Sequence, residues 1–164
     1  MNSPVLQFPL REWMNSIVPE VFDTMLSLKA APTPAGSSPH PVSGEQISGA
    51  IGIAGETLTG AVYLHLSLPF AREITALLLG SAPGESPAPA EINDLVGEFC
   101  NMVSGRLKSS LSDHGAPCAM SPPSIIRGSA FAIEAMPNAI MEKFHFDCLT
   151  HRLCVEIHLQ PQKP

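Results

Sequence analysis

Apolar residues between positions 91 and 111 recur at spacings of three and four, which predicts a long amphipathic helix with one buried face. The residues expected on that face are Ile92, Leu95, Val96, Phe99, Val103 and Leu107. At about 100° per residue, a second set falls together on the far side of the helix. This set is Asp94, Glu98, Asn101 and Gly105. We therefore expect a polar ridge, defined as Asp94, Glu98 and Asn101, that faces outward while the opposite face packs on the core.

Two glycines interrupt the same helix next to the ridge. Gly97 and Gly105 each cost about 1 kcal/mol relative to alanine in a helix interior. We interpret them as clearance for a partner that comes close to the helix backbone.

The remaining pattern alternates helices with strands. Residues 10–28 form a second amphipathic pattern, in which Pro19 predicts either a kink near Ser16 or a new helix start. A shorter helix is expected between a Ser67 cap and a Gly80 stop. Strands are expected at residues 47–54, 58–68, 124–127, 129–135, 141–148 and 151–159, with a turn at Gly128 between the third and fourth.

The last two strands predict a hairpin with a defined register. If Leu149 and Thr150 form the turn, residues whose numbers sum to 299 lie opposite each other. The predicted inner pairs are Phe146 with Leu153 and Phe144 with Val155, and the predicted outer pairs are Asp147 with Arg152 and Lys143 with Glu156.

Residues 10–80 and 91–159 each consist of a long helix followed by antiparallel strands, which indicates an α+β fold of two weakly related halves. Aligning the two helices places Ser16, Glu20 and Asp23 at the positions of the ridge. An ionised aspartate cannot donate a hydrogen bond, whereas an amide can, so we interpret these three residues as a degenerate second site. The alternative, a helix surface that was never a site, stays open.

The composition agrees with one domain, residues 1–164, that is long enough to bury a core. Hydrophobic residues make up 45% of the chain and charged residues 15%, which is typical of a packed globule. Proline-rich loops are expected at residues 30–46 and 81–90, and the pattern leaves open whether residues 1–9 are ordered.

The charge and hydropathy of the chain exclude several classes of partner. The net charge is −6 and basic residues nowhere cluster, so nucleic acid is not an expected partner. No apolar run approaches the roughly 20 residues that span a bilayer, and the first residues lack a leader pattern. We expect a cytoplasmic protein without a membrane partner, whose four scattered cysteines form no disulfides.

Four segments share an order along the chain with a known family. They are VFDTML at 21–26, GIAGETLTGAVYLHLSLPFA through LLLG at 52–80, the spacing Asp94-x3-Glu98-x2-Asn101, and SPPSIIRG at 121–128. In this order they resemble the CheX branch of the CheC/CheX/FliY chemotaxis phosphatases. The ridge spacing alone occurs by chance in many helices, so the resemblance depends on the ordered set.

The resemblance implies an antiparallel sheet packed by long helices and hydrolysis of the phosphoaspartate of a CheY-like response regulator. It implies that Glu98 and Asn101 enter the regulator's active site, where Asn101 orients the attacking water and Glu98 pairs with a lysine. Asp94, Gly97 and Gly105 are then expected to contact the partner. No metal or cofactor of the chain's own is expected, because Mg²⁺ would lie in the receiver domain, and a homodimer formed by joining sheets is expected.

The chain departs from the family pattern at one position. Ser124 occupies the place of a proline, and Pro123 lies one residue early. Catalytic competence therefore stays open, and the alternative is a non-catalytic CheX-like module that binds a receiver domain or another signalling or flagellar-switch partner.

Two other kinds of chemistry are less well supported. The first is a zinc site, because His145, Cys148, His151 and Cys154 are spaced three apart and both side-chain types bind zinc. In the predicted hairpin, however, the first and last of these share one face and the middle two share the other. A nucleophilic hydrolase is set aside because no G-x-S-x-G sequence occurs.

Overall fold

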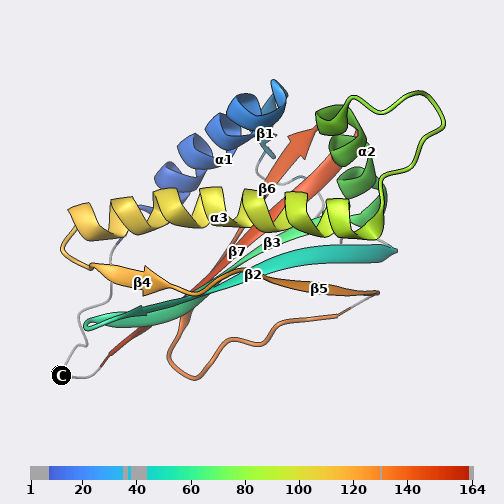
Figure 1. Cartoon of the computed structure of the whole chain (residues 1–164). Coiled ribbons are helices and arrows are strands. Elements are labelled where there is room, and N and C mark those ends of the chain that lie inside the picture. The colour runs from blue at the N-terminus through green and yellow to red at the C-terminus, as the bar shows by residue number, and fades with distance from the viewer. Residues whose placement is uncertain (1–7, 35–36, 38–43, 130, 163–164) are drawn as a thin grey trace.

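The structure is a computed structural model that describes residues 8–34, 37, 44–129 and 131–162. In this part of the chain, a seven-stranded antiparallel sheet carries three helices on one face (Figure 1). The strand order is β1-β6-β7-β3-β2-β4, and β5 also pairs with β2. The predicted α+β class is confirmed, while the question of order at residues 1–9 falls almost entirely outside the described residues.

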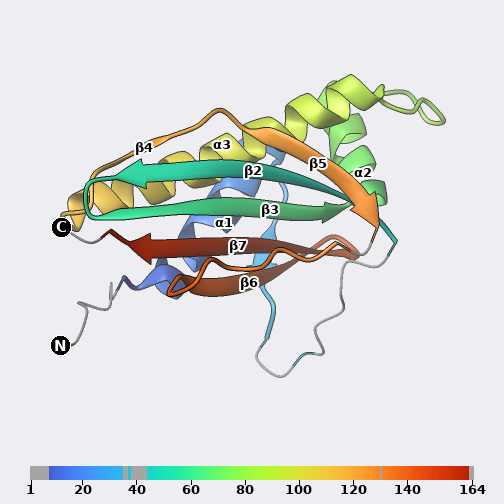
Figure 2. The ribbon, with the colours of Figure 1, turned by 90° about the horizontal axis from the view of Figure 1, so that it is seen from below.

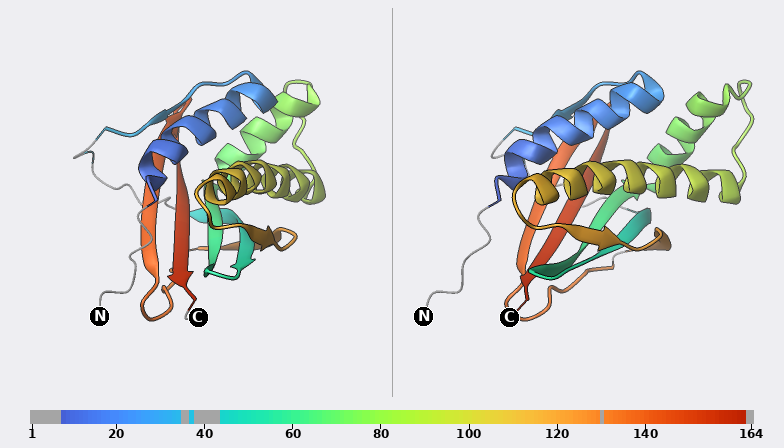
Figure 3. Two further views of the ribbon diagram at one scale, coloured as in Figure 1. Left: turned by 90° about the vertical axis from the view of Figure 1, so that its left-hand side faces the viewer. Right: turned by 60° about the vertical axis from the view of Figure 1, so that its left-hand side comes forward.

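The helices are α1 Leu10–Leu26, α2 Leu68–Leu79 and α3 Pro89–Asp113. The strands are β1 Ala30–Pro32, β2 Glu45–Gly55, β3 Leu58–Ser67, β4 Cys118–Met120, β5 Ser124–Ser129, β6 Ile140–Cys148 and β7 His151–Pro161. Helices α1 and α3 lie side by side, and α2 lies near the beginning of α3 (Figure 3).

Local signals in the sequence explain where the helices begin and end. The Ser67 hydroxyl accepts a hydrogen bond from the Phe70 amide at 3.3 Å, and Gly80 ends α2 with a φ of 62°, as predicted. Helix α1 continues through Pro19, so the predicted new start at that residue is wrong. The buried face on both sides of Pro19 holds the helix together where the proline removes a backbone donor.

The hairpin predicted from the last two strands forms, and the strands predicted at residues 47–54 and 58–68 pair with each other as β2 and β3. The pairing of β6 with β7 has the predicted register, with Phe146 opposite Leu153 and Lys143 opposite Glu156. The other predicted apolar and charged pairs, Phe144–Val155 and Asp147–Arg152, also form, and Arg152 Nε donates to Asp147 Oδ1 at 2.7 Å.

Three strand predictions were wrong. Strand β1, which pairs with β6, lies inside the segment predicted to be the first proline-rich loop. Strand β4 lies between the predicted long helix and the strand predicted at residues 124–127, where no strand was expected. Gly128 does not form a turn, because β5 continues through it opposite Gln46 of β2, and residues 131–135 form no strand. Three-residue edge strands and an in-register glycine have no periodicity that distinguishes them from a loop.

The position of α3 depends on a close approach to the sheet. A Cβ atom at Gly49 of β2 would lie 2.8 Å from Cys100 Cβ, so only glycine allows α3 to pack this close. Phe22, Phe70 and Phe99 meet where the three helices join, with ring centroids of Phe22 and Phe99 4.8 Å apart. Because the Cys100 face is fixed against the sheet, the opposite face of α3 points away from it.

Candidate functional site: the outer face of helix α3

Helix α3 is held at its beginning by its own residues and by β5. The backbone amide of Ala88 donates to Glu91 Oε2 at 2.7 Å, which caps the first turn. Arg127 of β5 donates from Nη2 to Asn93 Oδ1 at 2.6 Å and to the Pro89 carbonyl at 3.1 Å. Sequence reasoning missed this arginine, since an isolated charge in a strand carries no signal of its partner.

The ridge is exposed, as the helical pattern predicted. Asp94, Glu98 and Asn101 are all exposed, and the apolar face behind them is buried. Within the described residues, no hydrogen bond or ion pair joins any of these three side chains to another group. Two carboxylates and an amide on a rigid helix are thus available to a group outside this chain.

The corresponding set on α1 is occupied by contacts within the chain. The Ser16 hydroxyl donates to Glu20 Oε1 at 3.0 Å, and Arg106 of α3 forms an ion pair with the other oxygen of Glu20. Asp23 is exposed. The structure therefore brings Ser16 and Glu20 together but directs the glutamate to a side chain of α3.

The two glycines of α3 have different surroundings. Gly97 is buried, and a Cβ there would contact Pro123 Cγ at 3.6 Å. The close neighbour of Gly97 in the structure is this chain's own β4–β5 segment, since Pro123 and Ile125 lie against it, and its predicted contact with a partner stays a prediction. At Gly105 a Cβ would meet nothing within 4 Å, so this glycine does border open space.

The shifted proline also has a place in the structure. Pro123 packs under α3 at Gly97, and the next residue, Ser124, starts β5. The segment that departs from the family pattern therefore still contacts the helix that carries the ridge.

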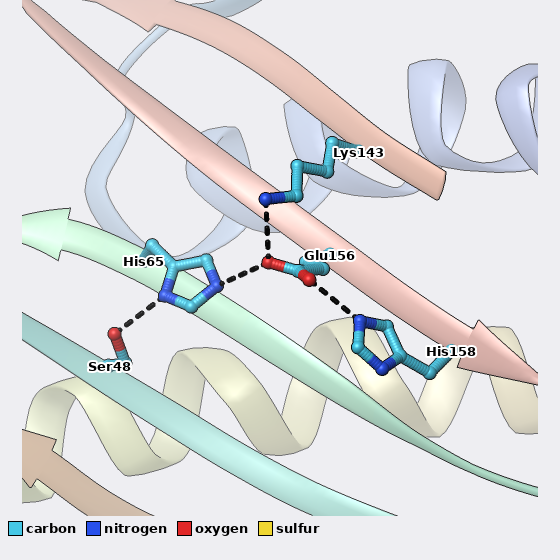
Figure 4. Close-up of polar contacts among 5 residues, drawn as sticks. All are labelled: Ser48, His65, Lys143, Glu156 and His158. Carbon is cyan, nitrogen blue, oxygen red and sulfur yellow. Dashed lines mark hydrogen bonds and ion pairs between the residues drawn. The ribbon is translucent and has the colours of Figure 1, made fainter. Parts of the chain in front are cut away.

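A second polar cluster lies on the opposite face of the sheet (Figure 4). Glu156 accepts from His65 Nε2 at 3.1 Å and from His158 Nε2 at 2.6 Å, and Lys143 Nζ lies 3.5 Å from the same carboxylate. Ser48 Oγ lies 2.7 Å from His65 Nδ1, to which it donates when Nε2 carries the ring proton. The sequence predicted the pair of Lys143 and Glu156 but not the two histidines. His65 comes from a different strand, β3, and His158 lies two residues after Glu156 on β7.

This cluster is suited to stabilising the sheet. Ser48 is 0% exposed and Glu156 is 2% exposed, and the ring of Phe131 lies 6.1 Å from the His65 ring. Residues 131–139, which precede β6, run across this face (Figure 2). Burial acts to raise the pKa of Glu156, but the hydrogen bonds from His65 and His158 and the charge of Lys143 lower that pKa to about 2. A hydroxyl with no exposed surface is poorly placed to attack a substrate.

The register of β6 with β7 confirms that the four residues considered as zinc ligands lie on two different faces of the hairpin. His145 lies opposite Cys154, and Cys148 lies opposite His151 on the other face, where His151 Nε2 is 2.7 Å from Glu73 Oε2. Among the described residues, no group of three or more histidine, cysteine, aspartate or glutamate side chains is arranged to hold a metal ion. No helix in the described part of the chain is long and apolar enough to cross a membrane.

Comparisons with known proteins agree on one family. The family model described as chemotaxis phosphatase CheX matches residues 47–147, which include the whole ridge. No curated protein sequence matches the chain.

Solved structures share the fold over nearly the full chain. Chemotaxis protein CheX from Vibrio vulnificus has a TM-score of 0.78 at 24% identity, over 98% of this chain and 100% of that chain. A CheC-like superfamily protein from Shewanella sp. PV-4 has a TM-score of 0.75 at 26% identity, over 92% and 96% of the two chains. A complex of CheX with CheY, BeF3 and Mg²⁺ from Borrelia burgdorferi contains a chain with a TM-score of 0.62 at 17% identity, over 92% and 97%.

Proposed function

Because the chain belongs to the family of the chemotaxis phosphatase CheX, we propose that it hydrolyses the aspartyl phosphate of a CheY-like receiver domain. In this proposal the outer face of α3 enters the receiver's active site, Asn101 orients the attacking water, and Glu98 pairs with a lysine there. The observation that carries the proposal is that Glu98 and Asn101 are exposed, one turn apart, and unpaired within the described residues.

The chemistry of an aspartyl phosphate suits this pair of side chains. The bond is already an activated acyl phosphate, so the main requirement is a water held in line with the leaving carboxylate oxygen. The Asn101 amide accepts from that water through its oxygen and donates through its nitrogen, without adding negative charge near the phosphoryl group. A carboxylate at this position would repel both the phosphoryl oxygens and the incoming nucleophile.

Glu98 is placed to set the docking geometry. It precedes Asn101 by about one turn on the same face, so a cation bound to Glu98 fixes how deeply the amide enters the receiver. Asp94 lies one turn further back and extends the same negative strip. In this proposal the Mg²⁺ that binds the phosphoryl oxygens belongs to the receiver, whose acidic pocket supplies the carboxylates that this ion prefers. The CheX complex from Borrelia burgdorferi, which contains CheY, BeF3 and Mg²⁺, supports a partner of this kind.

The expected location and oligomeric state of the protein follow from the same proposed function. We expect the protein to act in the cytoplasm, where receiver domains are phosphorylated, and to form a homodimer. The edge strand β5 carries mostly exposed side chains and is available for joining two sheets.

The second candidate is a CheX-like module that binds a receiver without hydrolysing its phosphate. Its support is the replacement of the family proline by Ser124 beside the segment under α3. A module of this kind would occupy the same surface and leave the lifetime of the phosphate unchanged.

The deciding experiment follows the decay of receiver domains from the same organism, each phosphorylated with acetyl phosphate and freed of the donor. We expect the wild-type protein to shorten the phosphate lifetime of at least one receiver catalytically. The control is Asp113→Asn, a substitution of an exposed carboxylate at the far end of α3. Unchanged lifetimes for every receiver, with binding still measurable, would select the non-catalytic module.

A further inference from the structure

A groove lies next to the ridge, between the end of α1, the end of α2 and the first half of α3. Its volume is about 280 Å³. The residues that line it are Met25, Thr75, Leu78, Leu79, Glu91, Asp94, Leu95 and Glu98. Two ridge residues are therefore also part of its wall.

Part of the groove lining consists of apolar side chains that the fold leaves uncovered. Leu78 is 48% exposed and Leu79 is 51% exposed, at the end of a helix whose other face is buried. Gly80 holds this helix end in place, with the Ser81 amide bonded to the Ala76 carbonyl at 3.0 Å. Adjacent exposed leucines beside a proposed binding site are the kind of surface that a partner covers.

The rim of the groove is negative. Glu91 is engaged by the Ala88 amide, but Asp94 and Glu98 have no partner among the described residues, and none of the lining residues is a cation. Exposed apolar side chains next to a free carboxylate match a long aliphatic stem that ends in a positive charge. A wholly apolar side chain would instead remove water from Asp94 without replacing its hydrogen bonds.

We infer that the groove binds a lysine or arginine side chain of the receiver domain, with its stem on Leu78, Leu79 and Met25 and its charged end at Asp94. This inference deepens the proposed function and rests on it. Glu98, which lies one helical turn after Asp94, pairs with the lysine of the receiver's active site. Two cations held one turn apart fix both the position and the rotation of the receiver on α3, so the groove selects among receivers by a residue outside their active site.

The experiment measures binding of a BeF3-activated receiver by titration calorimetry, which separates docking from hydrolysis. Leu78→Ser and Leu79→Ser are each expected to weaken binding by about five- to twentyfold. The matched control is Leu77→Ser, because Leu77 is 55% exposed on the same helix end but does not line the groove. Asp94→Asn keeps the shape of the rim and is expected to weaken binding by about tenfold at low salt, with a smaller loss at high salt.

The cation is identified by a double-mutant cycle. Each exposed lysine and arginine around the receiver's phosphorylation site is changed to methionine, and each variant is titrated with wild type and with Asp94→Asn. One receiver variant is expected to abolish the tenfold effect of Asp94→Asn, because both changes remove the same ion pair.

The outcomes separate the groove from the phosphatase activity. Equal binding by the Leu77, Leu78 and Leu79 variants, or the absence of any coupled receiver residue, would overturn the groove while leaving hydrolysis by wild type intact. Loss of binding in the groove variants without any hydrolysis by wild type would support the groove and refute the phosphatase. If wild type neither binds nor dephosphorylates a receiver, both are wrong.

Discussion

Helices α1 and α3 carry polar residues at the same spacing, yet the two sets differ in what they contact. On α1, Glu20 is bonded to Ser16 and paired with Arg106. On α3, Glu98 and Asn101 are exposed and make no side-chain bond within the described residues. The same spacing of polar residues thus serves packing between helices in one place and is available for binding in the other. The difference lies in the neighbours, which the spacing alone does not show.

Glu156 extends this comparison to the far side of the sheet. It is a buried carboxylate with hydrogen bonds from two histidines and a lysine nearby. Paired carboxylates such as Glu156 and Glu20 should therefore affect stability, and the unpaired Glu98 should affect the partner.

The first prediction concerns the amide. Asn101→Ala should lower the rate of receiver dephosphorylation at saturation by at least about 100-fold, because the attacking water loses its orientation. Asp23→Ala, the matched change on α1, should leave the rate within about twofold. Single-turnover decay of the phosphorylated receiver measures both, and equal loss in the two variants would contradict the assignment to α3.

The second prediction concerns the glutamates. Glu98→Ala should raise the receiver concentration needed for half-maximal rate by about ten- to a hundredfold, since an ion pair that sets docking is lost. Glu20→Ala should leave that concentration unchanged and lower only the melting temperature. A titration of receiver against initial rate compares the two, and a shift in the Glu20 variant would show that α1 also docks.

The sequence predicted contacts between residues that are close along the chain, and it did not predict contacts between distant ones. Helical periodicity placed Glu98 and Asn101 outward, and cross-strand pairing gave the register of β6 with β7, because both are local regularities. The contact of Arg106 with Glu20 joins residues far apart in the sequence, as does that of Arg127 with Asn93. Such contacts depend on how the helices pack on the sheet, so no spacing of residues in the sequence predicts them.

The surroundings of Gly97 were hidden from the sequence for the same reason. A glycine inside a helix correctly indicated a close neighbour, but the pattern could not say whether that neighbour was a partner or Pro123 of the same chain. In the same way, the outer face of the sheet was predicted from strand alternation, whereas the buried network around His65 required knowing that β3 pairs with β7.

The third prediction concerns the paired, buried carboxylate. Glu156→Gln should lower the free energy of unfolding by about 1 to 3 kcal/mol, because the amide cannot accept from both His65 and His158 as the carboxylate does. Dephosphorylation by the folded variant should be unchanged. Urea unfolding at neutral pH, with the rate assay as control, tests both statements.

The same carboxylate gives a pH dependence of known sign. The pKa of Glu156 is lowered from 4.5 to about 2 in the folded protein, so its stabilising contribution is complete above pH 4.5 and is lost as the pH falls toward 2. The difference in unfolding free energy between wild type and Glu156→Gln should therefore shrink below pH 4.5. A difference that stays constant down to pH 2.5 would contradict the role of the charge.

The fourth prediction separates the two glycines of α3. Gly97→Ala and Gly105→Ala should each raise the unfolding free energy by about 0.5 to 1 kcal/mol, since alanine favours the helix and neither Cβ meets an atom closer than ordinary contact. Only Gly105→Ala should weaken receiver binding, because Gly97 is covered by Pro123. Calorimetric binding of both variants decides whether a partner approaches the backbone at Gly105.

The smallest effect is expected from freeing the α1 set. Arg106→Gln removes an exposed ion pair and should cost under about 1 kcal/mol of stability. In an Asn101→Ala background, adding Asp23→Asn gives α1 the amide that it lacks, and Arg106→Gln releases Glu20. We expect no return of dephosphorylation, because Ser16 still holds Glu20 by a hydrogen bond of 3.0 Å along the helix. Recovered hydrolysis would instead show that α1 carries a decayed site and that the ion pair of Arg106 with Glu20 keeps this site inactive.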